Sequence, residues 1–117
     1  MAMSIPTEIR LSADKKTLTV HFDDDAHFEV PAELLRVESP SAEVQGHDPS
    51  QKNIIPGKRN VEILKIEQVG NYAVRLVFDD MHETGIYSWP ILRRLGEQGD
   101  DLMQTYLAAL AENGLSR

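Results

Sequence analysis

The feature that most limits the fold of this chain is an alternation of apolar and polar side chains with a period of two residues. The segments TEIRLS and TLTVHF are apolar at every second position, and the ADKK between them has the composition of a turn. After an acidic turn, DDDA, the segment HFEV continues the alternation. Because strands that bury one face show this pattern, we predict a hairpin followed by a short third strand.

A second group of strands is expected further along the chain. The segments VEILKIEQV and YAVRLVF, joined by Gly70 and Asn71, predict another hairpin, and TGIYSW predicts a last short strand. In YAVRLVF the apolar side chains share one face. In VEILKIEQV the apolar parity changes between Ile63 and Leu64, which a β-bulge or burial on both faces would explain.

Short helices are predicted between and after the strands. PAELLRVES gives about two helical turns with Pro31 in the first turn, and WPILRRLGEQG gives a short helix opened by Pro90. A further short helix is expected to begin after Ser39 and to end before Gly46. Residues 47–60 are rich in turn formers and predict a long loop.

The C-terminal residues 101–113 predict a longer helix. Apolar side chains recur there at helical spacing on one face, at Leu102, Met103, Tyr106, Leu107 and Leu110. Asp101 and Gln104 match a capping box, and Gly114 would end the helix. We expect the stripe to pack within a monomer, because so small a domain can hardly spare five apolar side chains. The whole pattern predicts one α+β domain over residues 1–117, a two-layer arrangement of a largely antiparallel sheet with short helices packed on one side.

The net charge, the cysteine content and the length of the apolar runs limit which partners and which metal sites this chain can have. The formal net charge is −7, which argues against nucleic-acid binding that depends on clustered basic residues. The chain has no cysteine, so disulfides and thiolate metal sites are excluded. No apolar run reaches membrane-spanning length, and MAMSIPTEIR lacks the pattern of a signal peptide. We therefore expect a cytoplasmic protein that does not bind membranes.

The histidines are the side chains best suited to bind a metal ion or to exchange a proton near neutral pH. No glycine-rich phosphate loop or nucleophile elbow occurs, so no catalytic residues are predicted. His21 and His27 fall on the polar face of the first strands, where we expect exposure. They would approach one another if those strands pair, although two imidazoles make a weak metal site at best. His82 lies in a turn beside acidic residues, where it is either a structural hydrogen-bonding residue or a metal ligand.

Two longer stretches carry a family resemblance. LLRVESPSAEVQGHDPSQ and VGNYAVRLVFDDMHETGIYSWPILRRL resemble the small N-terminal domain of gamma-butyrobetaine hydroxylase and its relatives, over about residues 7–97. Bacteria carry this domain as a short stand-alone protein of unknown function, and a related domain is appended to some iron–sulfur carrier proteins of plastids. In members that bind zinc, the helix after LLR carries Cys-x-Cys-x-x-Cys, and a histidine in an Asp-Gly-His turn completes the site.

The chain departs from that pattern at the zinc site. The three cysteine positions correspond to Ser39, Ser41 and Val44, while the histidine is retained as His82 and the glycine before it is replaced by Met81. A serine hydroxyl is a poor zinc ligand and valine has no donor atom, whereas structural zinc needs four good ligands. The resemblance therefore implies a degenerate zinc site, with no cofactor expected and with His82 in a hydrogen-bonding role.

Two functions follow from the resemblance and the residues. The first is a non-catalytic adaptor domain that docks an unknown protein through Tyr72, His82, Tyr87 and Trp89, although a lone tryptophan is also a natural core residue. The oxygenase chemistry of the hydroxylases belongs to a separate domain, so the resemblance implies no enzyme activity. The alternative is a protein that handles iron or zinc and is linked to iron–sulfur assembly. It would bind the metal through a weak site at Asp79, Asp80, His82 and His47.

Overall fold

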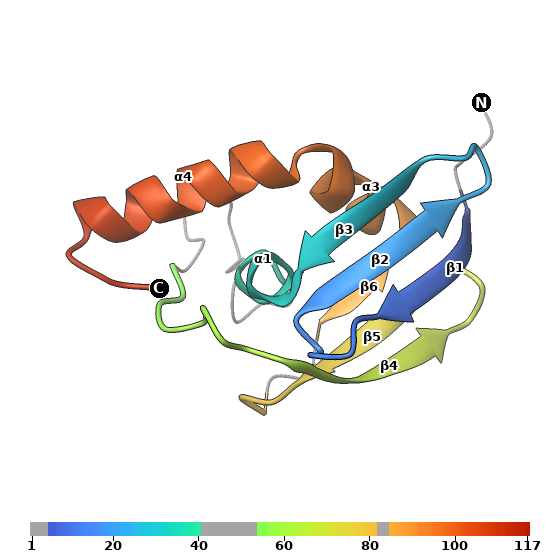
Figure 1. Cartoon of the computed structure of the whole chain (residues 1–117), viewed down its shortest axis with the longest axis horizontal. Helices are drawn as coiled ribbons and strands as arrows, with labels where there is room; N and C mark the ends of the chain where they lie inside the picture. The colour runs from blue at the N-terminus through green and yellow to red at the C-terminus, as the bar shows by residue number, and fades with distance from the viewer. Residues whose placement is uncertain (1–4, 41–53, 82–84) are drawn as a thin grey trace.

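The computed structural model of the chain describes residues 5–40, 54–81 and 85–117. Six strands and three helices follow one another along these residues (Figure 1). The strands are β1 (Pro6–Leu11), β2 (Thr17–Phe22), β3 (His27–Pro31), β4 (Ile63–Val69), β5 (Ala73–Phe78) and β6 (Ile86–Ser88). The helices are α1 (Ala32–Val37), α3 (Trp89–Glu97) and α4 (Gly99–Glu112). The short helix predicted after Ser39 falls outside the described residues.

The strands form two antiparallel sheets, with the orders β1-β2-β3 and β4-β5-β6. Both predicted hairpins are therefore confirmed, and β3 and β6 each add one strand to a hairpin. The predicted change of parity in β4 is a bulge, because Ile63 pairs with Phe78 whereas Lys65 pairs with Val77. The extra residue, Leu64, is left exposed at the bulge.

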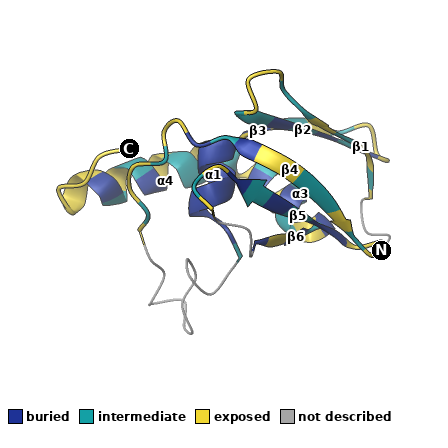
Figure 2. Cartoon of the chain, turned by 90° about the horizontal axis from the view of Figure 1, so that it is seen from below, coloured by how far each residue is buried: buried dark blue, intermediate teal, exposed yellow. Residues whose placement is uncertain are grey.

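One apolar core lies between the two sheets, which Figure 2 shows as separate layers. Each sheet contributes the side chains of one parity, with Leu18, Val20, Phe22 and Val30 from the first and Ile63, Val74, Leu76, Phe78 and Tyr87 from the second. The predicted α+β class and antiparallel pairing are confirmed. The division into two sheets was not predicted, because alternation identifies a buried face but not the element that covers it.

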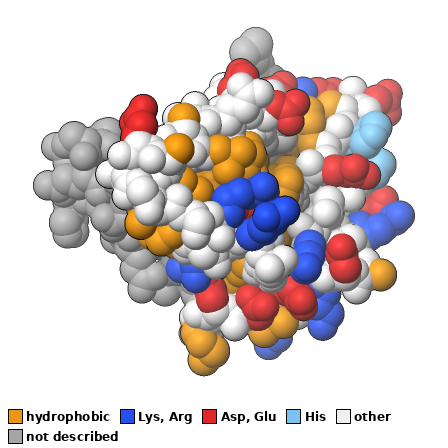
Figure 3. All heavy atoms as spheres, turned by 60° about the vertical axis from the view of Figure 1, so that its left-hand side comes forward, with side chains coloured by type: hydrophobic (Ala, Val, Ile, Leu, Met, Phe, Trp, Pro, Cys, Tyr) orange, Lys and Arg blue, Asp and Glu red, His pale blue; other side chains and the backbone are white. Residues whose placement is uncertain are grey.

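The outer face of the β1-β2-β3 sheet is polar. His21 and His27 lie opposite one another on adjacent strands, and the view in Figure 3 shows the two described histidines side by side on the surface. The strands on either side of the acidic turn do pair, so the condition under which the two histidines would approach one another is met.

The helices cover one edge and one end of the sheets. Helix α3 packs against β3 so closely that a Cβ added to Gly96 would lie 2.5 Å from Cγ of Phe28. Helix α4 begins at Gly99 after an N-cap residue without a side-chain hydrogen bond, so the predicted capping box at Asp101 is wrong. Its apolar stripe packs within the chain as predicted, since Tyr106 and Leu110 are buried. None of the helices in the described part of the chain has the length and apolar character that a membrane span requires.

Candidate functional site

Only part of the predicted degenerate zinc site belongs to the described residues. Ser39 is described and is fully buried at the end of the segment that follows α1. Ser41, Val44, His47 and His82 lie outside the described residues. The turn between β5 and β6 is described up to Met81 and again from Gly85.

Ser39 lies directly against the end of that turn. A Cβ added to Gly85 would lie 2.7 Å from the Ser39 Oγ and 3.0 Å from the ring of Tyr87, so only glycine fits at this position without movement. The segment after α1 and the start of β6 are therefore in contact, as the resemblance implied. We call the contact of Leu35 and Ser39 with Gly85 and Tyr87 the α1–β6 junction.

The Tyr87 hydroxyl holds this junction together. It donates a hydrogen bond to the backbone carbonyl of Leu35, one of the last carbonyls of α1, which have no partner within the helix. The hydroxyl of Ser39 hydrogen-bonds the same phenol oxygen. Burial raises the pKa of Tyr87 although the Ser39 hydrogen bond and the charge of Arg36 lower it, so the phenol remains a donor at neutral pH.

The burial of Tyr87 corrects one residue of the predicted interaction surface. Tyr87 is 0% exposed because it pairs with Val74 and points into the core between the sheets. A docked protein cannot contact it, so Tyr87 is a core residue. A strand of only three residues shows too little alternation for its buried parity to be read from the sequence.

The β5–β6 turn keeps a backbone conformation that favours glycine. Met81 has a φ of +75° and its side chain is 86% exposed. A residue with a Cβ is strained in this left-handed region, by about 1–2 kcal/mol. The resemblance described above aligns Met81 with a glycine, and the φ of Met81 is one that glycine adopts without strain.

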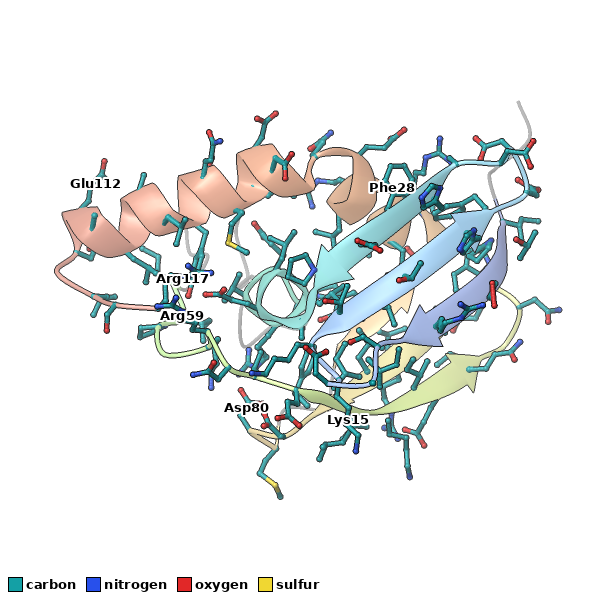
Figure 4. The ribbon with its side chains drawn as sticks, viewed as in Figure 1. Lys15, Phe28, Arg59, Asp80, Glu112 and Arg117 are labelled. Carbon is teal, nitrogen blue, oxygen red and sulfur yellow. The ribbon has the colours of Figure 1, made fainter. Side chains whose placement is uncertain are left out.

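An ion-pair network lies beside the turn and was not anticipated from the sequence. The carboxylate of Asp80, which is labelled in Figure 4, accepts from Arg36 Nε at 2.8 Å and from Lys58 Nζ at 2.6 Å. Arg36 is 9% exposed, and its Nη1 meets no acceptor among the described residues. The sequence signal was present in AELLRV, where Arg36 follows two leucines, but two helical turns do not show which face is buried.

These contacts bear on the predicted weak metal site. Asp80 is already paired with two cations, and Asp79 Oδ1 accepts the backbone N–H of Glu62 at 3.1 Å. A metal ion at this position would have to displace these donors. Within residues 5–40, 54–81 and 85–117, no three His, Asp or Glu side chains are placed to hold a metal ion together.

A hollow of the described surface lies between the two sheets. It has a volume of about 450 Å³ and runs between the edge strands β1 and β4. Its apolar lining comes from Ile9, Ile66, Val74 and Trp89, with Pro6, Thr7, Glu8 and Gln68 completing the walls. We call this hollow the inter-sheet groove.

The strand pairing explains why the groove exists. At one end the sheets are joined, because the backbone N–H of Ile63 in β4 donates to the carbonyl of Lys15 in the β1–β2 turn at 2.8 Å. Lys15 is labelled near the start of β4 in Figure 4. Towards Pro6 and Gln68 the groove is open, and in the described part of the chain neither β1 nor β4 has a strand on its outer side.

One of the predicted interaction residues, Trp89, lines the groove, and the backbone of a second, Tyr72, lies next to it. Trp89 is 8% exposed, lines the groove, and donates its indole N–H to the carbonyl of Asn71 at 2.8 Å. Its backbone N–H donates to the carbonyl of Tyr72, whose side chain is 59% exposed. Trp89 and Tyr72 were chosen from the sequence as candidate interaction residues, but the sequence could not show that a groove separates the sheets beside Trp89.

Comparisons with known proteins give the chain a family. The family model described as "Gamma-butyrobetaine hydroxylase-like, N-terminal" matches residues 9–93. The search of curated proteins finds no match. Two structures described as NMR solution structures are each 45% identical to the chain, with a TM-score of 0.84. They cover 97% and 99% of this chain, which covers 85% and 91% of theirs.

A third solved structure has a weaker likeness. It is the crystal structure of a protein of unknown function of the DUF971 family from Acidithiobacillus ferrooxidans, 37% identical with a TM-score of 0.65. It covers 78% of this chain, and this chain covers 91% of it. The matched family model spans most of the strands and α3. The chain belongs to the gamma-butyrobetaine hydroxylase-like N-terminal domain family.

Proposed function

We propose that this chain is a non-catalytic adaptor domain that binds an extended segment of a partner protein in the inter-sheet groove. The observation that carries the proposal is a groove of about 450 Å³ between two strand edges, in which Trp89 and other apolar side chains lie beside polar ones. Its volume lies in the range of sites that accept organic ligands or side chains.

The groove offers two kinds of contact at once. The outer backbone groups of an edge strand can pair with an added strand, and pockets beside it select the side chains of that strand. Here the edges are β1 and β4, and the pocket is formed by Ile9, Ile66 and Trp89. Tyr72 stands exposed next to Trp89, and large aromatic side chains are frequent anchors of protein interfaces.

We further propose that the α1–β6 junction takes over the structural task of the family's zinc site. Ser39 is fully buried and bonded to Tyr87, so its hydroxyl already has a partner. Hydrogen bonds between α1 and β6 then hold together the two segments that a metal ion would otherwise link. In this role the junction stabilises the fold through hydrogen bonds alone, without a bound metal ion and without catalysing a reaction.

The proposal is tested by comparing matched variants in an affinity pull-down. Ile66→Ser changes the groove, and Ile86→Ser makes the same change on β6, outside it, at a side chain that is 44% exposed. Tyr72→Ala adds a variant at an exposed position where folding does not depend on the side chain. The tagged native protein is compared with the three variants after circular dichroism has shown that each is folded.

The proposal expects specific proteins retained by the native chain and by Ile86→Ser to be lost from Ile66→Ser and Tyr72→Ala. Retention of the same proteins by all four chains would contradict a role for the groove. Loss from Ile86→Ser alone would place the interaction on the outer face of the β4-β5-β6 sheet instead.

A further inference from the structure

His21 and His27 form a close pair on the outer face of the β1-β2-β3 sheet. They are directly opposite one another in the register of β2 and β3. Their ring centres are 5.2 Å apart and the ring planes differ by 16°. His27 is exposed and His21 is half-buried, so solvent and ions reach both imidazoles.

We infer that His21 and His27 form a two-histidine site for an exchangeable transition-metal ion of the Zn²⁺, Cu²⁺ or Ni²⁺ type. Imidazole nitrogens are ligands that these ions prefer. The inference is independent of the proposed adaptor function, and the site is separate from the positions of the family's zinc ligands.

The separation of the rings fits one shared ion. With a metal–nitrogen distance of about 2.0–2.1 Å, the centre of a bound imidazole lies about 3.2 Å from the ion. Two such rings at a tetrahedral angle have centres about 5.2 Å apart. The rings of His21 and His27 already have this separation.

The ring planes can turn without losing this separation. Parallel stacked rings do not point their nitrogens at one ion, so at least one imidazole must rotate. Rotation about χ2 turns the ring about an axis that passes close to its centre, and χ2 of histidine is a broad torsion. Binding therefore needs a side-chain rotation and no movement of the strands.

The charges near the pair favour a cation. The acidic turn with Asp23 and Asp25 follows β2 directly, and Glu8 lies beside His21 in the register of β1. Figure 3 shows acidic side chains close to the two histidines. A negative surface raises the local concentration of cations, and the formal net charge of −7 acts in the same direction.

The number of ligands decides what kind of site this is. Glu8 is paired with Arg10, and no third protein ligand joins the two imidazoles within the described residues. Structural zinc sites have four protein ligands, so water must complete the coordination of an ion held by two histidines. The site is therefore suited to an ion that binds and leaves, and not to one on which folding depends.

The test is a titration of the full chain with zinc sulfate, followed by the NMR signals of the histidine rings. The signals of His21 and His27 should change together and saturate at one ion per chain. His27→Asn should weaken binding by about tenfold or more, because one of the two ligands is lost. His21→Asn should do the same, whereas the control His82→Asn should bind like the native chain.

Two results would overturn the inference. The first is zinc binding that is unchanged in both His21→Asn and His27→Asn while circular dichroism shows them to be folded. The second is a zinc-dependent change at His82 or His47 with no change at His21 and His27, which would place the ion elsewhere. Absence of any ring shift up to millimolar zinc would have the same meaning.

Discussion

Removing one oxygen atom from Tyr87 should destabilise the fold, because its hydroxyl is the polar link of the α1–β6 junction. In Tyr87→Phe the ring still fills the core, so little packing is lost. The carbonyl of Leu35 loses its donor, and the hydrogen bond between Ser39 and the phenol oxygen is lost as well. A buried polar group left without a partner costs about 1–3 kcal/mol.

Two hydrogen bonds are lost, each with a net contribution of about 1 kcal/mol, so the expected loss of stability is about 2 kcal/mol. Urea unfolding followed by tryptophan fluorescence or circular dichroism measures it. With a slope of about 2 kcal/mol per molar urea, the midpoint should fall by about 1 M. The slope itself should not change, because the variant buries nearly the same surface.

Tyr106→Phe is the matched control. The Tyr106 hydroxyl also donates to a backbone carbonyl, that of Ile55 at 2.6 Å, but this bond is only partly buried and water can replace it. The midpoint of Tyr106→Phe should fall by less than half as much. Equal effects of the two substitutions, or an unchanged midpoint in Tyr87→Phe, would refute the role given to the junction.

Four further results are expected. Met81→Gly should raise the free energy of unfolding by about 0.5–1 kcal/mol, because it relieves a φ of +75° at an exposed residue; an unchanged or lower value in thermal melts would contradict this. Leu110→Ala should cost about 2–5 kcal/mol and leave the sedimentation coefficient unchanged, since Leu110 is 2% exposed within its own chain. The hydrogen bond from Arg93 lowers the pKa of Asp24. This pairing therefore stabilises the fold at pH values above the unfolded pKa of about 3.9, and its contribution is lost as the pH falls through the folded pKa. In urea unfolding, Asp24→Asn should lower the free energy of unfolding at pH 7 and leave it nearly unchanged near pH 2. Protein purified without chelator should contain no stoichiometric zinc by elemental analysis, and added chelator should leave its melting temperature unchanged.

The sequence predicted most of the strands because their alternation is a local property. The change of parity after Ile63 indicated either a bulge or burial on both faces, and the structure has the bulge. The approach of His21 to His27 was conditional on the pairing of their strands, which alternation alone does not establish. The start of α4 was misplaced because Asp101 and Gln104 match a capping pattern that the backbone does not use.

The candidate site depended on contacts that no local pattern records. Arg36 and Asp80 are far apart in the sequence, and their pairing requires the β5–β6 turn to lie beside α1. The inter-sheet groove requires the strands to separate into two sheets that join only near Lys15 and Ile63. Trp89 was therefore recognisable as a candidate but not as part of a groove.

Site-specific photo-crosslinking in cells tests the adaptor proposal most directly. A photoreactive phenylalanine derivative replaces Tyr72, an exposed residue whose backbone is bonded to that of Trp89 in the groove, and the same derivative replaces Ile86 on the outer face of β6 as the control. The account predicts a discrete crosslinked protein from position 72, with little or none from position 86. A crosslinked protein from position 86 alone, or no adduct from position 72 in cells that produce the chain at its native level, would contradict it.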